Sequence, residues 1–117
     1  MRLNEVAFGD ALPVGGYGPG FFRIGDQVIN GGMRVLPGTV APWAGYSDTQ
    51  ALIASAPTID VLLLGTGAET AHPPAAFRLA IEDAGIGLEP MSSPAACRTY
   101  NVLLGEGRRV GLAVLPV

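Results

Sequence analysis

Charged residues are scarce in this sequence, and positive charge is scarcer than negative. Only 15% of the 117 residues are charged, and seven arginines, with no lysine, against ten acidic residues give a formal net charge of -3. Proteins that bind DNA or RNA neutralise the phosphates with a basic patch or stripe. A net negative chain with so few cations offers no such footprint, so we expect no nucleic-acid partner.

Cysteine and histidine occur once each, as Cys97 and His72. A single cysteine cannot form an intramolecular disulfide, which is typical of a chain from a reducing compartment. A metal centre needs three or four suitable ligands in one cluster, and one thiol with one imidazole cannot supply them. We therefore expect no metal site and no cofactor.

Long apolar runs are also missing. No stretch approaches the roughly 18 uninterrupted apolar residues of a membrane-spanning helix. Residues 1–10 contain neither a basic segment followed by an apolar core, as in secretory signals, nor the Arg- and Ser-rich amphipathic helix of a mitochondrial presequence. These absences predict a soluble protein of the bacterial cytoplasm, with at most a peripheral association with the inner membrane.

Hydrophobic residues, by contrast, make up 49% of the chain, enough for one buried core in a single domain over residues 1–117. Short β-prone runs at 21–24 and 27–30 are joined by Gly25-Asp26, a two-residue connection typical of tight hairpins. Residues 33–36 form a third such run. Three short strands bury too little surface alone, so they must pack against the rest of the chain.

Two segments flank these strands. Residues 15–20 are expected to form a turn or irregular loop, because four glycines and a proline leave little to pack. Further along, a short helix is predicted to begin at Ser47 or Asp48, either of which can cap it, and to run to about Ala56, where Pro57 ends it.

The second half of the chain alternates strands with helices, which predicts parallel βαβ units. The expected elements are a strand at 59–64, a helix from Pro73 or Pro74 to about Ala84, a strand at 87–91, a helix capped by Ser93 and running to about Leu104, and a strand at 109–115. The expected fold class is α/β: a three-layer single domain with a central mixed, largely parallel sheet, helices on its faces and a short N-terminal β-hairpin region.

Two loops are expected to converge where the strands at 59–64 and 87–91 end, at the sheet edge that usually carries ligands. Each loop leads into a helix N-terminus, whose free N–H groups favour anions. The candidate ligand-binding residues in these loops are Gly65, Thr66, Gly67, Ser92 and Ser93. A phosphate or carboxylate is the expected ligand group. The structural alternative is that the glycines permit tight turns and the serines cap helices.

No catalytic residue is assigned. Gly65-Thr66-Gly67 resembles the start of a dinucleotide-binding loop, but Thr70 stands where the third glycine belongs, so NAD is not expected. Cys97 lies in the first turns of a helix beside Arg98, an environment that can lower a thiol pKa. A lone cysteine is more typical of a small buried side chain, and only His72 is available as its base.

The last helix carries a resemblance to a known family. Residues 95–104, Ala-Ala-Cys-Arg-Thr-Tyr-Asn-Val-Leu-Leu, and 106–110, Glu-Gly-Arg-Arg-Val, closely resemble the C-terminal signature of the mitochondrial respiratory complex I assembly factor 3 family. Further matches follow the family order, so that the resemblance covers nearly the whole chain: Gly16-Tyr17-Gly18, Phe22-Arg23, Trp43, Gly65-Thr66-Gly67, Pro73-Pro74 and residues 85–91.

The resemblance implies a compact three-layer α/β fold around a mixed sheet and, for the mitochondrial members, a role in assembling complex I without known catalysis. Small bacterial and archaeal domains of unknown function belong to the same family. The family pattern also singles out five residues of the last helix: Cys97, Arg98, Thr99, Tyr100 and Asn101. They form either a buried polar network that fixes the helix against the loop at 65–67, or a recognition surface for a protein or ligand.

Two functions therefore compete. The first is a non-enzymatic accessory domain that binds proteins, such as respiratory-complex subunits or assembly factors, while a membrane-bound complex is assembled. The second is a small anionic-ligand-binding protein or an enzyme that uses the crevice at the C-terminal ends of the parallel strands, with Cys97 or His72 as its reactive group.

Overall fold

The structure is a computed structural model that describes residues 6–7 and 12–117 of the chain. The stretch 1–10, in which the sequence predicts no targeting segment, lies outside the described residues apart from Val6–Ala7. Within the described ranges, no helix has both the length and the apolar character that crossing a bilayer demands.

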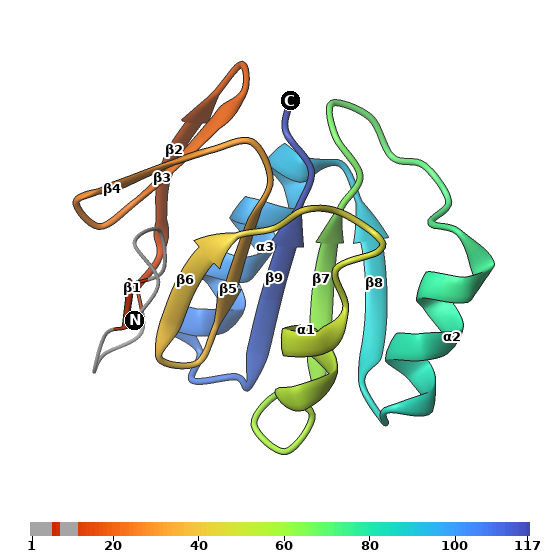
Figure 1. Cartoon of the computed structure of the whole chain (residues 1–117). Coiled ribbons are helices and arrows are strands. Elements are labelled where there is room, and N and C mark those ends of the chain that lie inside the picture. The colour runs from red at the N-terminus through yellow and green to blue at the C-terminus, as the bar shows by residue number, and fades with distance from the viewer. Residues whose placement is uncertain (1–5, 8–11) are drawn as a thin grey trace.

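The described residues form strands and helices that match most of the expected elements (Figure 1). In chain order they are β1 (Val6–Ala7), β2 (Val14–Gly18), β3 (Phe21–Ile24), β4 (Gln27–Asn30), β5 (Met33–Leu36), β6 (Thr39–Pro42), α1 (Gln50–Ala54), β7 (Val61–Gly65), α2 (Ala75–Asp83), β8 (Gly87–Met91), α3 (Ser93–Gly105) and β9 (Val110–Val114).

The main sheet has the strand order β1-β6-β5-β9-β7-β8. Its pairings are parallel for β7 with β8 and with β9, and antiparallel for β5 with β9, β5 with β6 and β1 with β6. The sheet is therefore mixed, but the expectation that it is largely parallel is wrong. The reason is the hairpin of β5 and β6, whose turn contains Gly38 at a φ of 86°. Strand β6 is not predicted from the sequence, because it has only four residues and ends in Pro42.

The predicted hairpin at 21–30 is confirmed as β3 and β4, which pair antiparallel across a turn with Gly25 at a φ of 55°. The turn or irregular loop expected at 15–20 is confined to the turn at 19–20, because residues 14–18 form strand β2 beside β3. Glycine suits this strand for a packing reason: a Cβ on Gly18 would collide with the ring of Phe21. The glycines that indicated a loop therefore make room for side chains of the neighbouring strand.

The helices begin at other residues than the sequence suggested. Neither Ser47 nor Asp48 caps α1; Thr49 occupies that position, without a side-chain hydrogen bond, and the Asp48 carboxylate accepts the Ala44 N–H at 3.1 Å. Helix α3 is capped by Ser92 rather than Ser93, since the Ser92 hydroxyl accepts the N–H of Ala95 at 3.3 Å. The spans of α2 and α3 lie within a few residues of the predicted ones.

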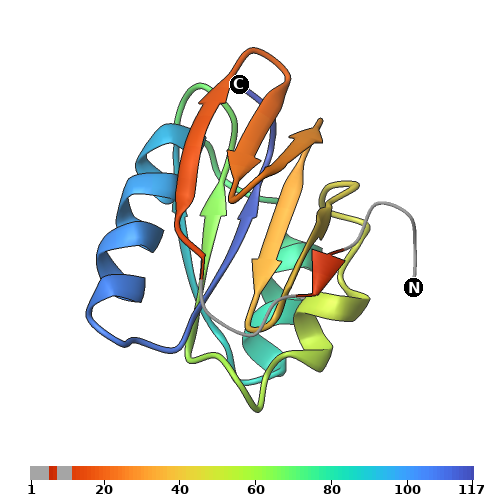
Figure 2. The same cartoon turned by 90° about the vertical axis from the view of Figure 1, so that its left-hand side faces the viewer.

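Both faces of the main sheet are covered (Figure 2). On one face, α3 and the β2–β4 sheet pack through residues such as Phe22, Leu63 and Tyr100. On the other, α1 and α2 pack through residues such as Leu52 and Phe77. All five residues of β9 are buried, as expected for an interior strand.

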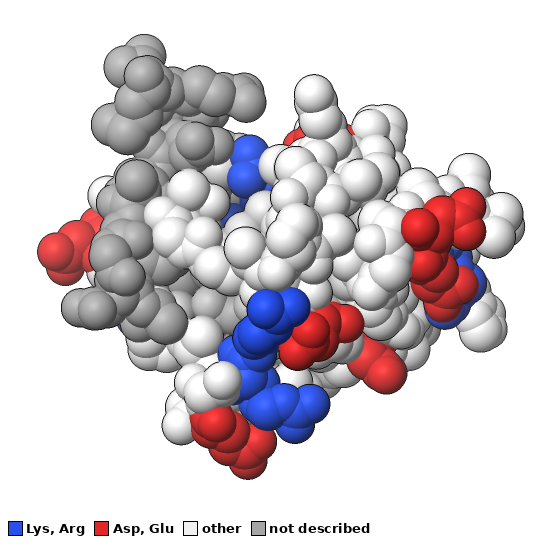
Figure 3. All heavy atoms as spheres, turned by 90° about the horizontal axis from the view of Figure 1, so that it is seen from below, with Lys and Arg blue, Asp and Glu red and all other residues white. Residues whose placement is uncertain are grey.

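The end of the sheet where β7 and β9 begin carries charges of both signs (Figure 3). The guanidinium of Arg109 forms an ion pair with the carboxylate of Asp60, with Nη2 and Oδ1 3.0 Å apart. Both side chains are more than half exposed, so solvent screens this pair and it contributes little to stability. Positive and negative side chains lie next to one another on this end of the molecule.

Candidate functional site

The C-terminal ends of three parallel strands meet at one edge of the main sheet. Gly65 at the end of β7 lies opposite Met91 of β8 on one side and Val114 of β9 on the other. The two loops predicted to converge do so here, and all five candidate ligand residues belong to this junction of strand ends. Their polar groups, however, bond to one another and to the backbone.

Ser93 is the centre of this junction, and it is fully buried. Its hydroxyl accepts the N–H of Gly67 at 3.0 Å and donates to the carbonyl oxygen of Leu115 at 2.6 Å. Its own N–H donates to the carbonyl of Gly67 at 2.7 Å. One serine thus joins the loop after β7, the start of α3 and the segment after β9.

Gly65 and Thr66 complete the junction. A Cβ on Gly65 would lie 2.5 Å from Val114 Cγ1 and 2.6 Å from Ser93 Oγ, so the close approach of these segments requires glycine. The Thr66 hydroxyl accepts a hydrogen bond from the N–H of Ala71 at 3.0 Å and donates one to the Glu69 carbonyl oxygen at 2.6 Å. These contacts support the structural interpretation of the two loops, and their assignment to a ligand stays a prediction.

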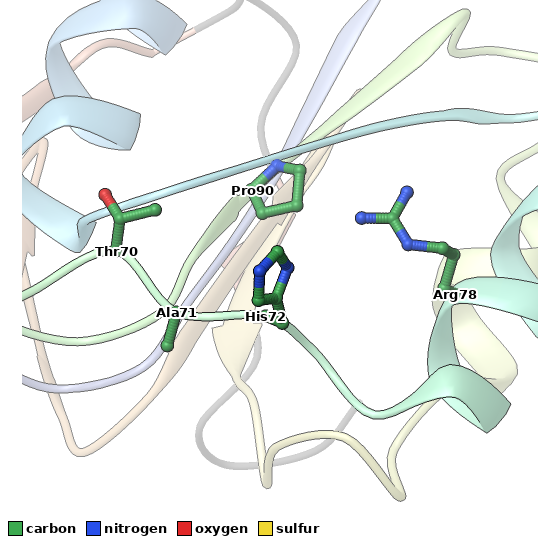
Figure 4. A pocket seen from close by; sticks show the side chains of 5 residues that line it. All are labelled: Thr70, Ala71, His72, Arg78 and Pro90. Atoms are coloured by element: carbon green, nitrogen blue, oxygen red, sulfur yellow. The ribbon is translucent and has the colours of Figure 1, made fainter.

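A cavity of about 310 Å³ lies beside the junction, between the loop at 70–72, the first turn of α2 and the edge strand β8 (Figure 4). It is lined by Thr70, Ala71, His72, Arg78 and Pro90. In Figure 4 the His72 ring lies beneath Pro90, and the Arg78 side chain extends from α2 toward both of them.

None of the five predicted ligand residues lines this cavity. The Arg78 guanidinium also forms an exposed ion pair with Glu82, with Nη1 and Oε2 3.2 Å apart. Arg78 carries no signal in the sequence, because it lines the same cavity as His72 only after the loop at 70–72 has folded beside β8.

Two of the five residues predicted on α3 form a polar clamp. Asn101 Oδ1 accepts the N–H of Val14 at 2.8 Å, and Asn101 Nδ2 donates to the Val14 carbonyl at 2.9 Å, so its amide bonds β2 as a neighbouring strand would. The Tyr100 hydroxyl donates to the Leu12 carbonyl at 3.3 Å. These bonds hold the segment 12–14, and not the loop at 65–67 that the predicted network was expected to hold.

Cys97 lies on the inner side of α3 and is only 3% exposed. Burial raises the pKa of its thiol to about 11, and the nearby positive charge of Arg98 offsets this only in part. Near neutral pH the thiol is therefore protonated and a poor nucleophile. This geometry matches the expectation of a small buried side chain.

Arg98 and Thr99 make none of the hydrogen bonds of the clamp. Arg98 is exposed, and it forms no hydrogen bond or ion pair with the described part of the chain. Thr99 is half-buried. The five residues of the family signature thus include an inner group with structural contacts, a half-buried Thr99 and an exposed Arg98.

The described residues also bear on metal binding. Across residues 6–7 and 12–117, no three side chains of His, Cys, Asp or Glu come together as a ligand cluster. His72 lies in the loop before α2.

Comparison with known proteins identifies the family. The chain belongs to the family described as "Protein of unknown function (DUF498/DUF598)", whose model matches residues 14–115. An uncharacterized protein of Rhodobacter capsulatus is 49% identical over all of this chain and 94% of its own length.

Relatives with a described role come from animals. The NADH dehydrogenase [ubiquinone] 1 alpha subcomplex assembly factor 3 of Danio rerio is 33% identical over 86% of this chain, and that of Homo sapiens is 29% identical over 99%. The matches span 62% and 67% of those longer proteins.

Solved structures share the fold. A crystal structure of a Bartonella henselae protein described as an outer membrane protein has a TM-score of 0.84 and 32% identity, covering 94% of this chain and 98% of that one. A Bordetella pertussis protein described as a Mth938-like domain has a TM-score of 0.73 and 27% identity, covering 99% and 92%.

Removing the Ser93 hydroxyl should destabilise the fold more than removing that of Ser92. Ser93→Ala leaves the Gly67 N–H and the Leu115 carbonyl without their partner in a buried site, at a cost of roughly 1–3 kcal/mol. Ser92→Ala removes a partly exposed cap worth about 1 kcal/mol. Urea unfolding of both variants measures the difference, and equal losses would contradict the central role of Ser93.

Replacing Asn101 tests the clamp on β2. Asn101→Asp should lower the free energy of unfolding by roughly 1–3 kcal/mol, because a carboxylate cannot donate to the Val14 carbonyl and places negative charge beside it. Arg98→Ala is the matched control on the outer side of the same helix and should change stability by less than about 0.5 kcal/mol. Thermal and urea unfolding would show whether the two variants differ in this order.

The buried thiol predicts a pH dependence of stability. An unfolded chain loses the Cys97 proton from about pH 8.5 upward, whereas the folded protein keeps it until near pH 11. In this window the folded state binds more protons, so the free energy of unfolding should fall as pH rises. The Cys97→Ala variant lacks the thiol, so its free energy of unfolding should fall less steeply with pH. The difference in slope should be at most about 1.4 kcal/mol per pH unit.

Urea unfolding of the wild type and Cys97→Ala at about pH 8 and about pH 10 measures this contribution. The Tyr100 hydroxyl, whose pKa burial raises to about 12, is present in both proteins and cancels in the comparison. Identical pH slopes would show that the thiol titrates normally in the folded state.

Proposed function

We propose that this chain is a non-enzymatic accessory domain that binds other proteins during the assembly of a membrane-bound respiratory complex. The observation that carries the proposal is the similarity to complex I assembly factor 3 over 86% to 99% of this chain in the Danio rerio and Homo sapiens proteins. Because the similarity extends over nearly the whole chain, it includes the junction of strand ends and α3 rather than one short motif.

The chemistry of the structure supports an accessory role over a catalytic one. The buried thiol of Cys97 is held in its protonated form, and the hydroxyl of Ser93 is occupied by two internal hydrogen bonds. A nucleophile needs exposure and an activating base within hydrogen-bonding reach. These two groups serve the packing of the fold instead.

The partners that fit this role are respiratory-complex subunits or other assembly factors. We place the protein in the cytoplasm, with peripheral contact with the inner membrane where such a complex is assembled. On this proposal, the exposed Arg98 and the half-buried Thr99 beside it are the part of the family signature that is accessible to another protein.

One observation favours the alternative function, a site for a small anion. The cavity beside the junction is lined by Arg78 and His72, and these side chains suit a carboxylate or phosphate. Arg78 already pairs with Glu82, which reduces the positive charge available to a ligand. We therefore rank this function second.

A complementation experiment separates the two functions. Deleting the gene from its bacterium should lower the amount of assembled NADH dehydrogenase complex in the membranes, measured on native gels and by NADH oxidation. A Cys97→Ala variant and a His72→Ala, Arg78→Ala variant should both restore the complex, because neither changes a surface that the accessory role assigns to a partner.

The tagged protein provides the second readout. Respiratory-complex subunits should co-purify with it from gently solubilised membranes, as identified by quantitative mass spectrometry. A normal complex in the deletion strain together with no respiratory subunits in the purification would refute the accessory function. Failure of the His72→Ala, Arg78→Ala variant alone would instead favour the anion site.

A further inference from the structure

Helix α3 has a clear division between its two sides, and it lies on the outside of the molecule (Figure 2). Ala96, Cys97 and Tyr100 are buried against the sheet. On the opposite side Arg98 is exposed and Val102 is 60% exposed. The outer face of α3 therefore presents an apolar side chain that the described residues of this chain do not cover.

Charges of opposite sign flank this apolar side chain. Arg98, Val102 and Glu106 follow one another at intervals of four, so they lie along one side of the helix. Glu106 is exposed and is the C-cap residue of α3, where a negative charge opposes the helix dipole. Neither Arg98 nor Glu106 has an ion-pair partner among the described residues.

This order of side chains is complementary to itself. When two such helices lie antiparallel with Val102 at the two-fold axis, the two Val102 side chains meet. Each Arg98 then faces the Glu106 of the other copy, because both lie four residues from the axis. A two-fold interface requires this kind of self-complementary surface.

We propose that two copies of this chain associate through α3, packed antiparallel about Val102, with Arg98 of each copy paired to Glu106 of the other. Ala95 and Gly105 lie on the same side of the helix, and their small size permits the close axial distance of about 8 Å found for tightly packed helices. Apart from its chain neighbours and the adjacent helix backbone, a Cβ on Gly105 would meet no atom of the described residues within 4 Å.

The contact area sets the strength of this dimer. Helix α3 has 13 residues, a length of roughly 20 Å. A single pair of helices this short buries less than the roughly 1,200 Å² of stable protein interfaces. The dimer is therefore weak and salt-dependent, and it forms at high local concentration. It does not depend on the proposed function, since it rests only on the outer face of α3.

Sedimentation equilibrium of the full chain at low ionic strength, up to about 1 mM, tests the pairing. Arg98→Glu and Glu106→Arg should each weaken the dimer by roughly tenfold or more, because each places like charges opposite one another. The double variant Arg98→Glu, Glu106→Arg keeps the net charge of the wild type and should recover its affinity to within about threefold.

The controls separate this interface from general effects of charge and folding. Arg78→Glu makes the same change of charge on α2 and should leave the dimer unaffected, and circular dichroism should show every variant folded. A wild type that stays monomeric at about 1 mM overturns the proposal and leaves the α3 face to a different protein. A dimer that the charge swap fails to restore also overturns it, because its contacts then lie elsewhere.

Discussion

The close contact between Gly65 and Ser93 is the constraint on which the rest of this structure depends. Ser93 reaches the loop after β7 and the segment after β9 through one buried hydroxyl. This is possible only because Gly65 has no side chain. The contact sets where α3 begins, and the direction of α3 decides which of its residues face the sheet. Loop, helix and terminal segment are thus positioned by a single site.

Helix α3 transmits that constraint in two directions. Its inner side packs on the sheet. The amide of Asn101 bonds the backbone of β2, as a neighbouring strand would. Its outer side carries Arg98 and Val102 into solvent. The family signature in this helix therefore serves the fold on one side and presents a surface on the other.

The site also shows why residue types alone are weak evidence for catalysis. Glycine, serine and threonine at the ends of parallel strands suit both an anion site and a tight structural junction. Here the hydrogen bonds of Ser93 and Thr66 run to neighbouring backbone, and the thiol of Cys97 is buried. The similarity to assembly factors and the internal hydrogen bonds of these groups both support the proposed accessory role over a catalytic one.

The sequence by itself determined the elements whose apolar pattern is strong and local. These are β7, β8, β9, α2, α3 and the hairpin of β3 and β4, together with the parallel pairing of β7 and β8. The convergence of Gly65 and Ser93 followed from that pairing, since parallel strands end at the same edge. Resemblance to a family was also readable from the chain, because the signature in α3 is continuous.

Only the tertiary structure decided the features that depend on contacts between distant segments. Strand β2 forms because β3 and Asn101 supply its hydrogen bonds. The glycines of β2 by themselves do not indicate a strand. The N-cap of α3 is Ser92 and not the predicted Ser93, because the Ser93 hydroxyl bonds Gly67 and Leu115 instead. The sheet is not largely parallel because β5 pairs antiparallel with β9 and with β6. Hydrogen bonds between residues far apart in sequence leave no periodic signal, so folding alone reveals them.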